Sequence, residues 1–472
     1  MRKSLFIALL VLLSAIPIQA DEPAEPVPVN RTFGIVEAFY RPREARMLGV
    51  TWERIVFAWN HFQPDGPDDF DTSAVPEDYL DSARQANREI VGLIKGTPAW
   101  ASAAGSVGAV PHGIQLPFDH PDNVFGAFVR RLVAYYSARG IHAWIILNEP
   151  DVRAPDEGNV VEFDGDVEDY FAMLRVAYRA ARSVDPAAHI QIAGMAWWSD
   201  WVKGREPYLR RLLSLIAQDP EADANHWYFD GISVHVYFTT STVWQMLSAY
   251  RGFLDEFDLE DKEIWITEFN ASPRRDPIGG LFDASFRVSL QQQANFIVQA
   301  SALGLAEGVS RMAVYRLYDD HFVPGVSEPW GLVRYDGSLR PAFYAYQEVI
   351  SRFSSARRVR RYSIPEATVV TMAFPGRTLY VMWSDTYQSG QFIVNAGERS
   401  DPVTVFDAQG RSWAQNVVRR AGAYVALIDA PAAEEIDIPW VVVAGAVRMV
   451  EIEGGPRAVW FRKPDGNVVQ FN

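Results

Sequence analysis

The hydrophobic and polar positions of the chain follow one pattern up to about Phe353 and another beyond it. In the first part, short apolar runs alternate with longer stretches whose apolar residues recur every three or four positions. Short apolar runs are typical of buried strands, and the longer spacing predicts amphipathic helices. The eight predicted strands are Phe33–Phe39, Arg54–Trp59, Ile90–Lys95, Ala143–Leu147, Ile190–Ala193, Gly231–Tyr237, Glu263–Glu268 and Arg311–Tyr315. The clearest predicted helices are Asn123–Arg139, Val167–Ser183, Ser285–Ala302 and Pro341–Phe353.

This alternation of strands and helices favours a parallel sheet whose strands are joined by helical crossovers. Eight strand–helix units between residues 31 and 353 predict a (β/α)8 barrel, the TIM-barrel fold. A doubly wound sheet could also hold eight strands, but no glycine-rich phosphate loop follows the first predicted strand. We therefore expect a catalytic barrel over residues 31–353.

Residues 354–472 follow the second pattern. Short β-rich runs, separated by turn residues such as Pro375 and Gly376, predict a small antiparallel β-sandwich-like domain. These runs are Thr368–Phe374, Leu379–Trp383, Val403–Phe406, Tyr424–Ile428 and Trp440–Val443. The expected fold class is thus an α/β barrel followed by a small all-β C-terminal domain.

The first 30 residues have the features of an export signal followed by a tether. Arg2 and Lys3 precede the apolar run Leu5–Ile16, and Ala20 offers a small residue at a cleavage point. The run is short for a membrane span, although an uncleaved anchor stays as the alternative. We expect residues 1–20 to be a signal peptide and 21–30 a linker, and the protein to be exported to the periplasm or the extracellular space.

Charge and composition disfavour several classes of function. The formal net charge of −15 disfavours binding to nucleic acid or to an anionic membrane surface. The absence of cysteine excludes disulfides and cysteine-ligated metal sites. The sequence has no P-loop, no zinc-binding His-Glu-x-x-His helix and no Gly-x-Ser-x-Gly elbow, and its eight histidines are scattered. We therefore expect no metal, no cofactor, and no membrane contact beyond an uncleaved N-terminal anchor.

Two acidic residues lie at the ends of predicted strands. Glu149 follows Ala143–Leu147 within Asn148-Glu149-Pro150, and Glu268 ends the seventh predicted strand. Because the strands of a parallel barrel end at one mouth, we expect both side chains there. Cleavage of a glycosidic bond typically uses two carboxyl groups that flank it. The alternative for Asn-Glu-Pro is the start of a helix, with Asn148 as its cap.

These residues resemble the pattern of the clan A glycoside hydrolases, a large group of retaining barrel enzymes. In that clan an Asn-Glu pair ends the fourth strand and a Glu ends the seventh. The resemblance implies that Glu149 is the acid/base and Glu268 the nucleophile. It also implies that Asn148 is a hydrogen-bond partner of the sugar 2-hydroxyl. It covers the chain from about Thr32 to Phe353.

Further segments agree with this resemblance. The second predicted strand is similar to the clan's segment whose arginine supports the nucleophile, which would be Arg54 here. His235-Val236-Tyr237 is similar to the His-x-Tyr of the sixth strand, and implies that Tyr237 lies near the nucleophile. Within the clan, the segment around Trp100 and the trailing β-domain are most similar to family 39.

One departure from the clan's pattern concerns the sugar site. The clan often places a tryptophan at the end of the eighth strand, under the bound sugar. Here that strand ends near Tyr315, and we expect Trp330 on the following loop to take the role instead.

Other residues near the strand ends carry less specific signals. Glu37 could bind a substrate hydroxyl or form a structural ion pair, and His235 could contact substrate or belong to the core. Asp319 and Asp320 are expected on a solvated loop. His61 follows the second predicted strand and could reach the mouth. One or two of four tryptophans after the third and fifth strands are expected to stack on a sugar, each with packing as its alternative: Trp100, Trp197, Trp198 and Trp201.

The sequence thus predicts a retaining glycoside hydrolase that cleaves β-linked glycosides or polysaccharide through a glycosyl-enzyme intermediate. Its expected partner is an oligo- or polysaccharide, and retention is implied by the resemblance. Two alternatives stay open: a transglycosylase that uses the same two glutamates, and a non-catalytic carbohydrate-binding protein of the cell envelope. The sugar, the linkage and the choice between endo and exo cleavage also stay open.

Overall fold

The computed structural model describes residues 30–152, 162–237, 239–278, 288–320, 329–398, 400–420, 422–436, 438 and 440–471. The predicted signal peptide, and the predicted linker except residue 30, lie outside the described residues. Within the described ranges, no helix combines the length and the apolar character that crossing a bilayer requires.

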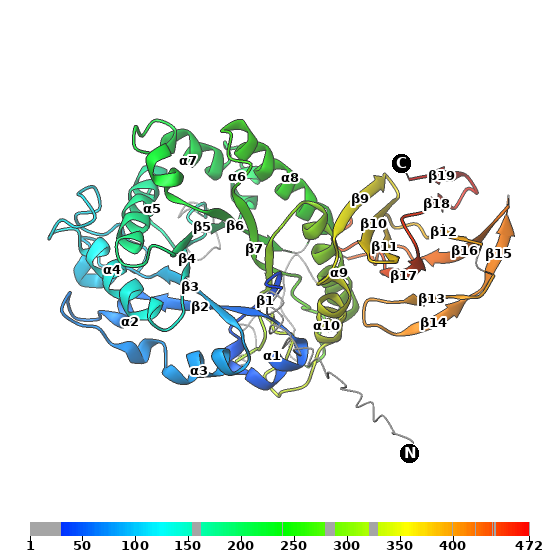
Figure 1. The fold of residues 1–472 in the computed structure, drawn as a ribbon, viewed down its shortest axis with the longest axis horizontal. Coiled ribbons are helices and arrows are strands. Elements are labelled where there is room, and N and C mark those ends of the chain that lie inside the picture. Colours follow the sequence, from blue (N-terminus) through cyan, green and yellow to red (C-terminus); the bar gives the residue numbers. More distant parts are fainter. Residues whose placement is uncertain are drawn as a thin grey trace, which may run out of the picture.

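Eight parallel strands close into a barrel, in the order of the chain, and helices surround it (Figure 1). This confirms the predicted fold class. The strands are β1 (Phe33–Val36), β2 (Trp52–Ala58), β3 (Glu89–Lys95), β4 (Ala143–Asn148), β5 (His189–Met195), β6 (Gly231–Tyr237), β7 (Glu263–Asn270) and β8 (Arg311–Val314). The helices are α1 (Pro42–Leu48), α2 (Trp59–Phe62), α3 (Glu77–Gln85), α4 (Val124–Ser137), α5 (Val167–Arg182), α6 (Trp198–Val202), α7 (Tyr208–Ile216), α8 (Thr240–Glu256), α9 (Leu290–Ala306) and α10 (Pro341–Phe353).

The predicted elements differ from these mainly at their ends. The first strand stops at Val36 because Glu37 adopts a left-handed conformation, with φ of 63°, and the short 3-10 turn Ala38–Tyr40 follows. The predicted helix Ser285–Ala302 begins only at Leu290, where the Ser289 side chain accepts a hydrogen bond from the backbone N–H of Gln292 in a capping box. Its first three residues lie outside the described ranges.

Large aromatic side chains fill the inside of the barrel and need a small partner on the neighbouring strand. The Trp52 ring lies against Gly34, where an added Cβ would come within 2.3 Å of the ring. Trp52 in turn packs on Trp265 of β7, with ring centroids 6.2 Å apart. Because side chains alternate along a strand, Arg54 of β2 faces the same interior as Trp52, above this aromatic layer.

After α10 the chain forms two antiparallel sheets, of six and five strands. The six-stranded sheet has the order β14-β13-β17-β11-β10-β9, and the five-stranded sheet the order β15-β16-β12-β18-β19. The strands are β9 (Arg358–Ile364), β10 (Ala367–Phe374), β11 (Arg377–Ser384), β12 (Gly390–Gly397), β13 (Val403–Phe406), β14 (Ser412–Gln415), β15 (Val417–Arg420), β16 (Ala423–Ala430), β17 (Arg448–Glu453), β18 (Val459–Arg462) and β19 (Val468–Gln470).

The central strands β10 and β11 of the six-stranded sheet are buried on both faces. On β10, Val369 belongs to the core shared with the five-stranded sheet, whereas the next residue, Val370, belongs to the core shared with the barrel. The sheet lies beside α9 and α10 (Figure 1), and every residue of α9 from 292 to 304 is buried. This helix therefore has no water-facing stripe over most of its length, which is typical of a helix between two packed layers.

The predicted strand Trp440–Val443 is wrong. This segment has no ladder partner and instead lies against the barrel helices, where the Val442 carbonyl accepts a hydrogen bond from the Thr240 backbone N–H at 2.9 Å. Val442 and Val443 are buried in the core shared with the barrel. This short apolar run is thus buried against helices rather than within a sheet. Hydrophobic periodicity alone does not distinguish these two environments.

Gln299 of α9 provides a test of this junction. Its amide accepts a hydrogen bond from the Thr240 hydroxyl at 2.7 Å and donates one to the Gly445 carbonyl at 2.9 Å, and the side chain is fully buried. Gln299→Ala would leave the Gly445 carbonyl buried without this donor and the Thr240 hydroxyl without its acceptor, although the hydroxyl still accepts from the Ala444 N–H. We expect a loss of about 1–3 kcal/mol in the free energy of unfolding, measured by urea denaturation.

Gln347→Ala is the matched control for this variant. Gln347 donates one hydrogen bond, to the Met47 carbonyl at 2.8 Å, in an exposed position. Its loss is expected to change the free energy of unfolding by less than about 0.5 kcal/mol. Equal effects of the two substitutions would contradict the role assigned to Gln299.

Candidate active site

The two glutamates singled out in the sequence lie at the same end of the barrel. Glu268 lies near the C-terminal end of β7, and Glu149 directly follows the last residue of β4. Glu149 has a left-handed backbone, with φ of 42°, which costs free energy for a residue with a side chain. Its backbone N–H donates to the Gly194 carbonyl of β5 at 3.0 Å, and this bond helps to fix the turn.

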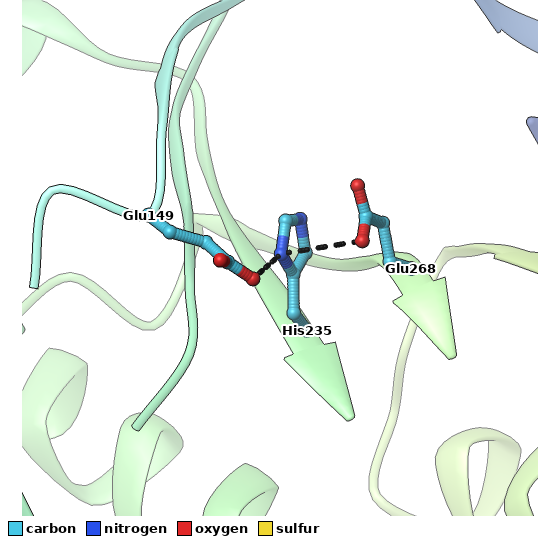
Figure 2. Close-up of side chains that lie close together, drawn as sticks. All are labelled: Glu149, His235 and Glu268. Carbon is cyan, nitrogen blue, oxygen red and sulfur yellow. Dashed lines mark hydrogen bonds and ion pairs between the residues drawn. The ribbon is translucent and has the colours of Figure 1, made fainter. Parts of the chain in front are cut away.

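His235 of β6 lies between the two carboxyl groups (Figure 2). Its Nδ1 is 2.7 Å from Glu149 Oε1 and 3.6 Å from Glu268 Oε2. One oxygen of each glutamate and one nitrogen of His235 all lie within 4.8 Å of one another. The structure therefore brings two carboxyl groups that are far apart in the chain close together at one end of the barrel.

Glu268 is surrounded by groups that favour its charged form. The Arg54 guanidinium lies 2.5 Å from Oε1, and the Tyr237 hydroxyl donates a hydrogen bond to Oε2. Burial would raise the pKa of Glu268, but the charges of Arg54 and His235, with these hydrogen bonds, hold it below its ordinary value. Burial and the charge of Glu268 raise the pKa of Tyr237 well above its ordinary value, so the phenol stays a donor.

Glu149 lies in a different environment. Its side chain is 24% exposed, against 9% for Glu268, and its partner here is His235. Burial would lower the pKa of His235, but the charge of Glu268 and the hydrogen bond to Glu149 raise it instead. Two carboxyl groups thus share one site but differ in access and in charge compensation, which is the arrangement that separates acid and base roles.

The same three side chains could be mistaken for a cation site, because they offer two oxygens and a nitrogen close together. However, Arg54 already neutralises Glu268, and a cation would have to compete with its guanidinium. The geometry therefore suits proton transfer and nucleophilic attack better than metal coordination.

Gly194 is a requirement of this site that the sequence interpretation missed. A Cβ at this position would lie 2.0 Å from Nε2 of the His235 ring. The ladder between β5 and β6 shifts register between Ile192 and Gly194, and that between β6 and β7 shifts between Val234 and His235. The available signal was a glycine inside a strand, which often marks a bulge or a close approach.

Asp151 was also missed. It is buried, and its carboxylate accepts hydrogen bonds from the backbone N–H groups of Ala196 at 3.1 Å and Trp197 at 2.8 Å. It thereby joins the loop after β4 to the loop after β5. Burial, with a smaller contribution from the charge of Glu149, raises the pKa of Asp151 to about 7.

The other predicted residues are placed as follows. Asn148 ends β4 beside Glu149, and its Oδ1 is buried without a hydrogen-bond partner among the described residues. Glu37 forms an ion pair with Arg316 at 3.1 Å. Trp100 donates to the Gln63 carbonyl at 2.7 Å, so it belongs to the packing of the loops after β2 and β3.

The aromatic candidates divide into two groups. The Trp330 ring lies 4.9 Å from that of Tyr237, and so stands beside the donor to Glu268. Trp197 instead stacks on Trp201 at 5.7 Å, and Trp201 and Trp198 are 71% and 43% exposed on α6.

Two further residues follow the strands β2 and β8. His61 is exposed on α2. The expectation that Asp319 is solvated is wrong, because it is buried in an ion pair with Arg340 at 2.6 Å. A charged residue stays buried only where an opposite charge compensates it. For Asp319 that charge is Arg340, more than twenty positions along the chain.

Solved structures share this fold at low sequence identity. A family 39 glycoside hydrolase from the gut symbiont Bacteroides cellulosilyticus WH2 matches with a TM-score of 0.63 and 17% identity, over 89% of this chain and 81% of that one. A monomeric β-xylosidase from Caulobacter crescentus CB15 matches with 0.55 and 13%, over 90% and 97%. A family 30 endoxylanase from Clostridium papyrosolvens C71 matches with 0.55 and 12%, over 90% and 96%.

Sequence comparisons give a second line of evidence. No curated protein sequence matches the chain. A family model described as the glycosyl hydrolase catalytic core matches residues 119–346, which include both glutamates and His235. The protein is a glycosidase. With the shared fold, this match confirms the resemblance to the clan A glycoside hydrolases.

Gly194→Ala tests how closely this glycosidase depends on the His235 ring position. The added methyl would push the ring away from β5 and break its hydrogen bond to Glu149. A displacement of about 1 Å in such a site can cost about a hundredfold in rate, and we expect a loss of that order in kcat/KM.

The control is Gly252→Ala on α8, where an added Cβ meets nothing within 4 Å. Alanine in a helix is favoured over glycine, so this variant is expected to keep its activity and gain up to about 1 kcal/mol of stability. A fully active Gly194→Ala enzyme would contradict the steric argument.

Asp151→Asn tests the buried carboxyl group through the pH dependence of stability. The pKa of Asp151 is about 7 in the folded protein, against about 3.9 in an unfolded chain. Between these values the folded state binds more protons, so the wild-type free energy of unfolding falls as the pH rises. Relative to Asp151→Asn, which does not titrate, the wild type should lose about 1 kcal/mol per pH unit between about pH 5 and about pH 7 in urea denaturation. Parallel pH profiles would refute the raised pKa.

Proposed function

We propose that this glycosidase cleaves β-linked glycosides with retention of configuration, with Glu268 as nucleophile and Glu149 as acid/base. The observation that carries the proposal is the separation of the two carboxyl groups, which bring one oxygen each to within 4.8 Å. Retaining enzymes hold these groups about 5–5.5 Å apart, whereas inverting enzymes leave about 6.5–9.5 Å for a water molecule. The gap suits direct attack on the sugar.

The first step forms a glycosyl-enzyme intermediate. A carboxylate oxygen of Glu268 attacks the anomeric carbon, and the bond from that carbon to the leaving oxygen breaks. Glu149, in its protonated form, gives its proton to the leaving oxygen. Arg54 and Tyr237 keep Glu268 ionised and oriented before the attack, because both contact its oxygens.

The second step reverses these roles. Glu149, now a carboxylate, removes a proton from a water molecule whose oxygen attacks the anomeric carbon. The bond between that carbon and Glu268 breaks, and Glu268 returns as a carboxylate. Two inversions give net retention. The greater exposure of the Glu149 side chain supports this exchange with water.

The substrate is proposed to be an oligo- or polysaccharide met outside the cytoplasm, because the sequence predicts export. The resemblance assigns the sugar 2-hydroxyl to Asn148, and its buried Oδ1 is available to accept that hydrogen bond. Xylosides are the first substrates to test, since similar folds include a β-xylosidase and an endoxylanase.

Substitution of the two glutamates tests this proposal. Glu268→Ala should abolish turnover of an aryl β-xyloside, because no nucleophile remains. Glu149→Gln should lower kcat by about 10²–10⁴-fold, most strongly for leaving groups that need a proton. Added azide should restore turnover of Glu268→Ala and give a product of inverted configuration, since the small anion attacks from the vacated face.

The matched control is Glu263→Gln, at the opposite end of the same strand β7 and exposed. It should keep wild-type kinetics. Proton NMR of the first product formed by the wild type decides the stereochemistry, and an inverted product would refute double displacement. Sugar binding without turnover in every assay would favour the non-catalytic alternative, and transfer to added acceptor sugars would favour the transglycosylase.

A further inference from the structure

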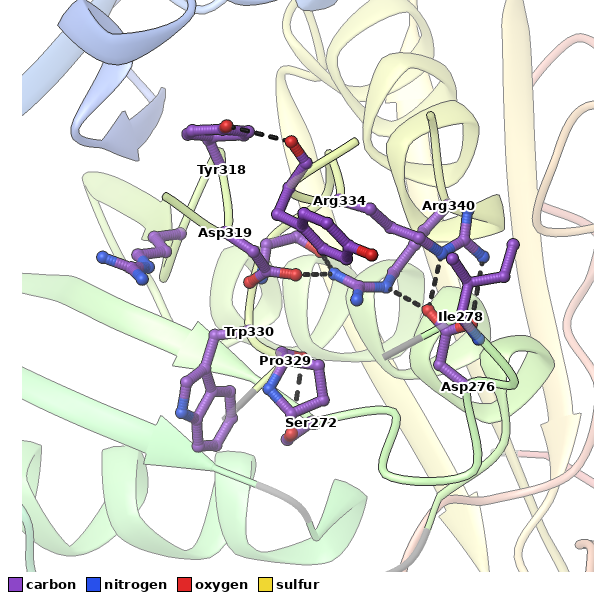
Figure 3. A network of polar contacts seen from close by, with 12 residues as sticks. Ser272, Asp276, Ile278, Tyr318, Asp319, Pro329, Trp330, Arg334 and Arg340 are labelled. Carbon is purple, nitrogen blue, oxygen red and sulfur yellow. Dashed lines mark hydrogen bonds and ion pairs between the residues drawn. The ribbon is translucent and has the colours of Figure 1, made fainter. Parts of the chain in front are cut away.

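A buried network of charges joins the loops that follow β7 and β8 (Figure 3). Asp276 is fully buried, and its Oδ2 accepts from Arg334 Nε at 2.7 Å and from Arg340 Nε at 2.8 Å. Arg340 also binds Asp319 Oδ2 at 2.6 Å. We call these four residues, Asp276, Asp319, Arg334 and Arg340, the loop brace.

The loop brace holds the backbone next to Trp330. Asp319 Oδ1 accepts from the Gly331 N–H at 2.7 Å, and the Arg340 guanidinium donates to the Gly331 carbonyl. No larger residue fits at this position, because a Cβ on Gly331 would lie 2.6 Å from both the Asp319 nitrogen and the Val333 oxygen. Both polar groups of the Gly331 backbone are thus bound by the brace.

A second contact ties Trp330 to the strand that carries Glu268. Asn270, two residues after Glu268, is fully buried and donates to the carbonyls of Trp330 at 2.7 Å and Tyr315 at 2.6 Å. The Trp330 ring then lies 4.9 Å from the Tyr237 ring in an edge-on arrangement. Trp330 is therefore fixed on two sides at the edge of the site.

Stability alone is a weak explanation for four buried charges. Removing charges from water costs free energy that their mutual attraction often only balances, and apolar packing would serve stability as well. Burial would raise the pKa of Asp276, yet hydrogen bonds from Arg334 and Arg340 hold it below its ordinary value. What these bonds give is fixed direction, since a guanidinium binds carboxylates in a planar fork.

We propose that the loop brace consists of positioning residues that hold Trp330 as an aromatic wall of the sugar site. It then determines the affinity for the sugar ring more than the rate of bond cleavage. The inference rests on the proposed function for its kinetic part, whereas the position of Trp330 can be measured without turnover.

The kinetic test uses Asp276→Asn, which keeps the shape of the side chain but removes its charge. We expect KM to rise about tenfold, the equivalent of one aromatic contact, and kcat to change by less than about threefold. Asp230→Asn is the matched control, because Asp230 also binds a guanidinium, that of Arg182 at 2.9 and 3.0 Å, and the backbone N–H of Ile190. It precedes β6, at the opposite end of the barrel, and should leave KM unchanged.

A double-mutant cycle links the brace to Trp330. Trp330→Ala should raise KM at least as much as Asp276→Asn, and the double variant should show no further rise. If Asp276→Asn raises KM equally in both backgrounds, or leaves it unchanged, the inference is wrong. Should this variant fail to fold, Arg334→Lys keeps the charge while losing the fork, and should give a smaller change in the same direction.

The position of Trp330 is read directly by fluorine NMR of protein labelled with 5-fluorotryptophan, with Trp330→Phe to assign its signal. The Trp330 signal should shift or broaden in Asp276→Asn and stay in place in Asp230→Asn. An unchanged signal overturns the brace. A wild type without glycosidase turnover overturns the proposed function but leaves this measurement decisive for the brace.

Discussion

The contact between Arg54 and Glu268 is the interaction on which the site depends. A carboxylate that is nearly excluded from water stays ionised only if an opposite charge and hydrogen bonds replace its hydration. Arg54 reaches Glu268 because alternate residues of β2 face the barrel interior. The closed barrel fixes the direction of this ion pair and keeps water from screening it, whereas an exposed ion pair has neither advantage.

The other groups around the two glutamates follow from this charge balance. His235 provides a second basic group between two acids, and Tyr237 adds a neutral donor that burial keeps protonated. Each comes from β6, whose ladder is irregular on both sides at this level. His235 lies at this irregularity with its ring toward the carboxyl groups, and Gly194 leaves the room that the ring needs. The chemistry of the site therefore depends on the local geometry of these strands.

Sequence patterns predicted the barrel and the strand-end glutamates, since both depend on local periodicity and on the order of elements. They did not predict that Asp319 is buried or that Asp151 and Asp276 matter, because a buried acid is recognised by its partners, and these come from distant parts of the chain. The prediction of a strand at Trp440–Val443 was wrong for a related reason. Its apolar residues specify burial but not the element that covers them.

Helix α9 has a consequence for how this glycosidase can be divided. Because residues 292–304 are buried between the barrel and the six-stranded sheet, removal of the sheets would expose the apolar core surface shared with them. It would also leave Gln292, Asn295 and Gln299 without the hydrogen bonds that they make to the C-terminal part of the chain. A barrel excised after residue 353 would expose a large apolar surface to water and would tend to aggregate. The barrel thus needs the trailing sheets to stay soluble. A fusion that places this barrel on another scaffold would have to include them.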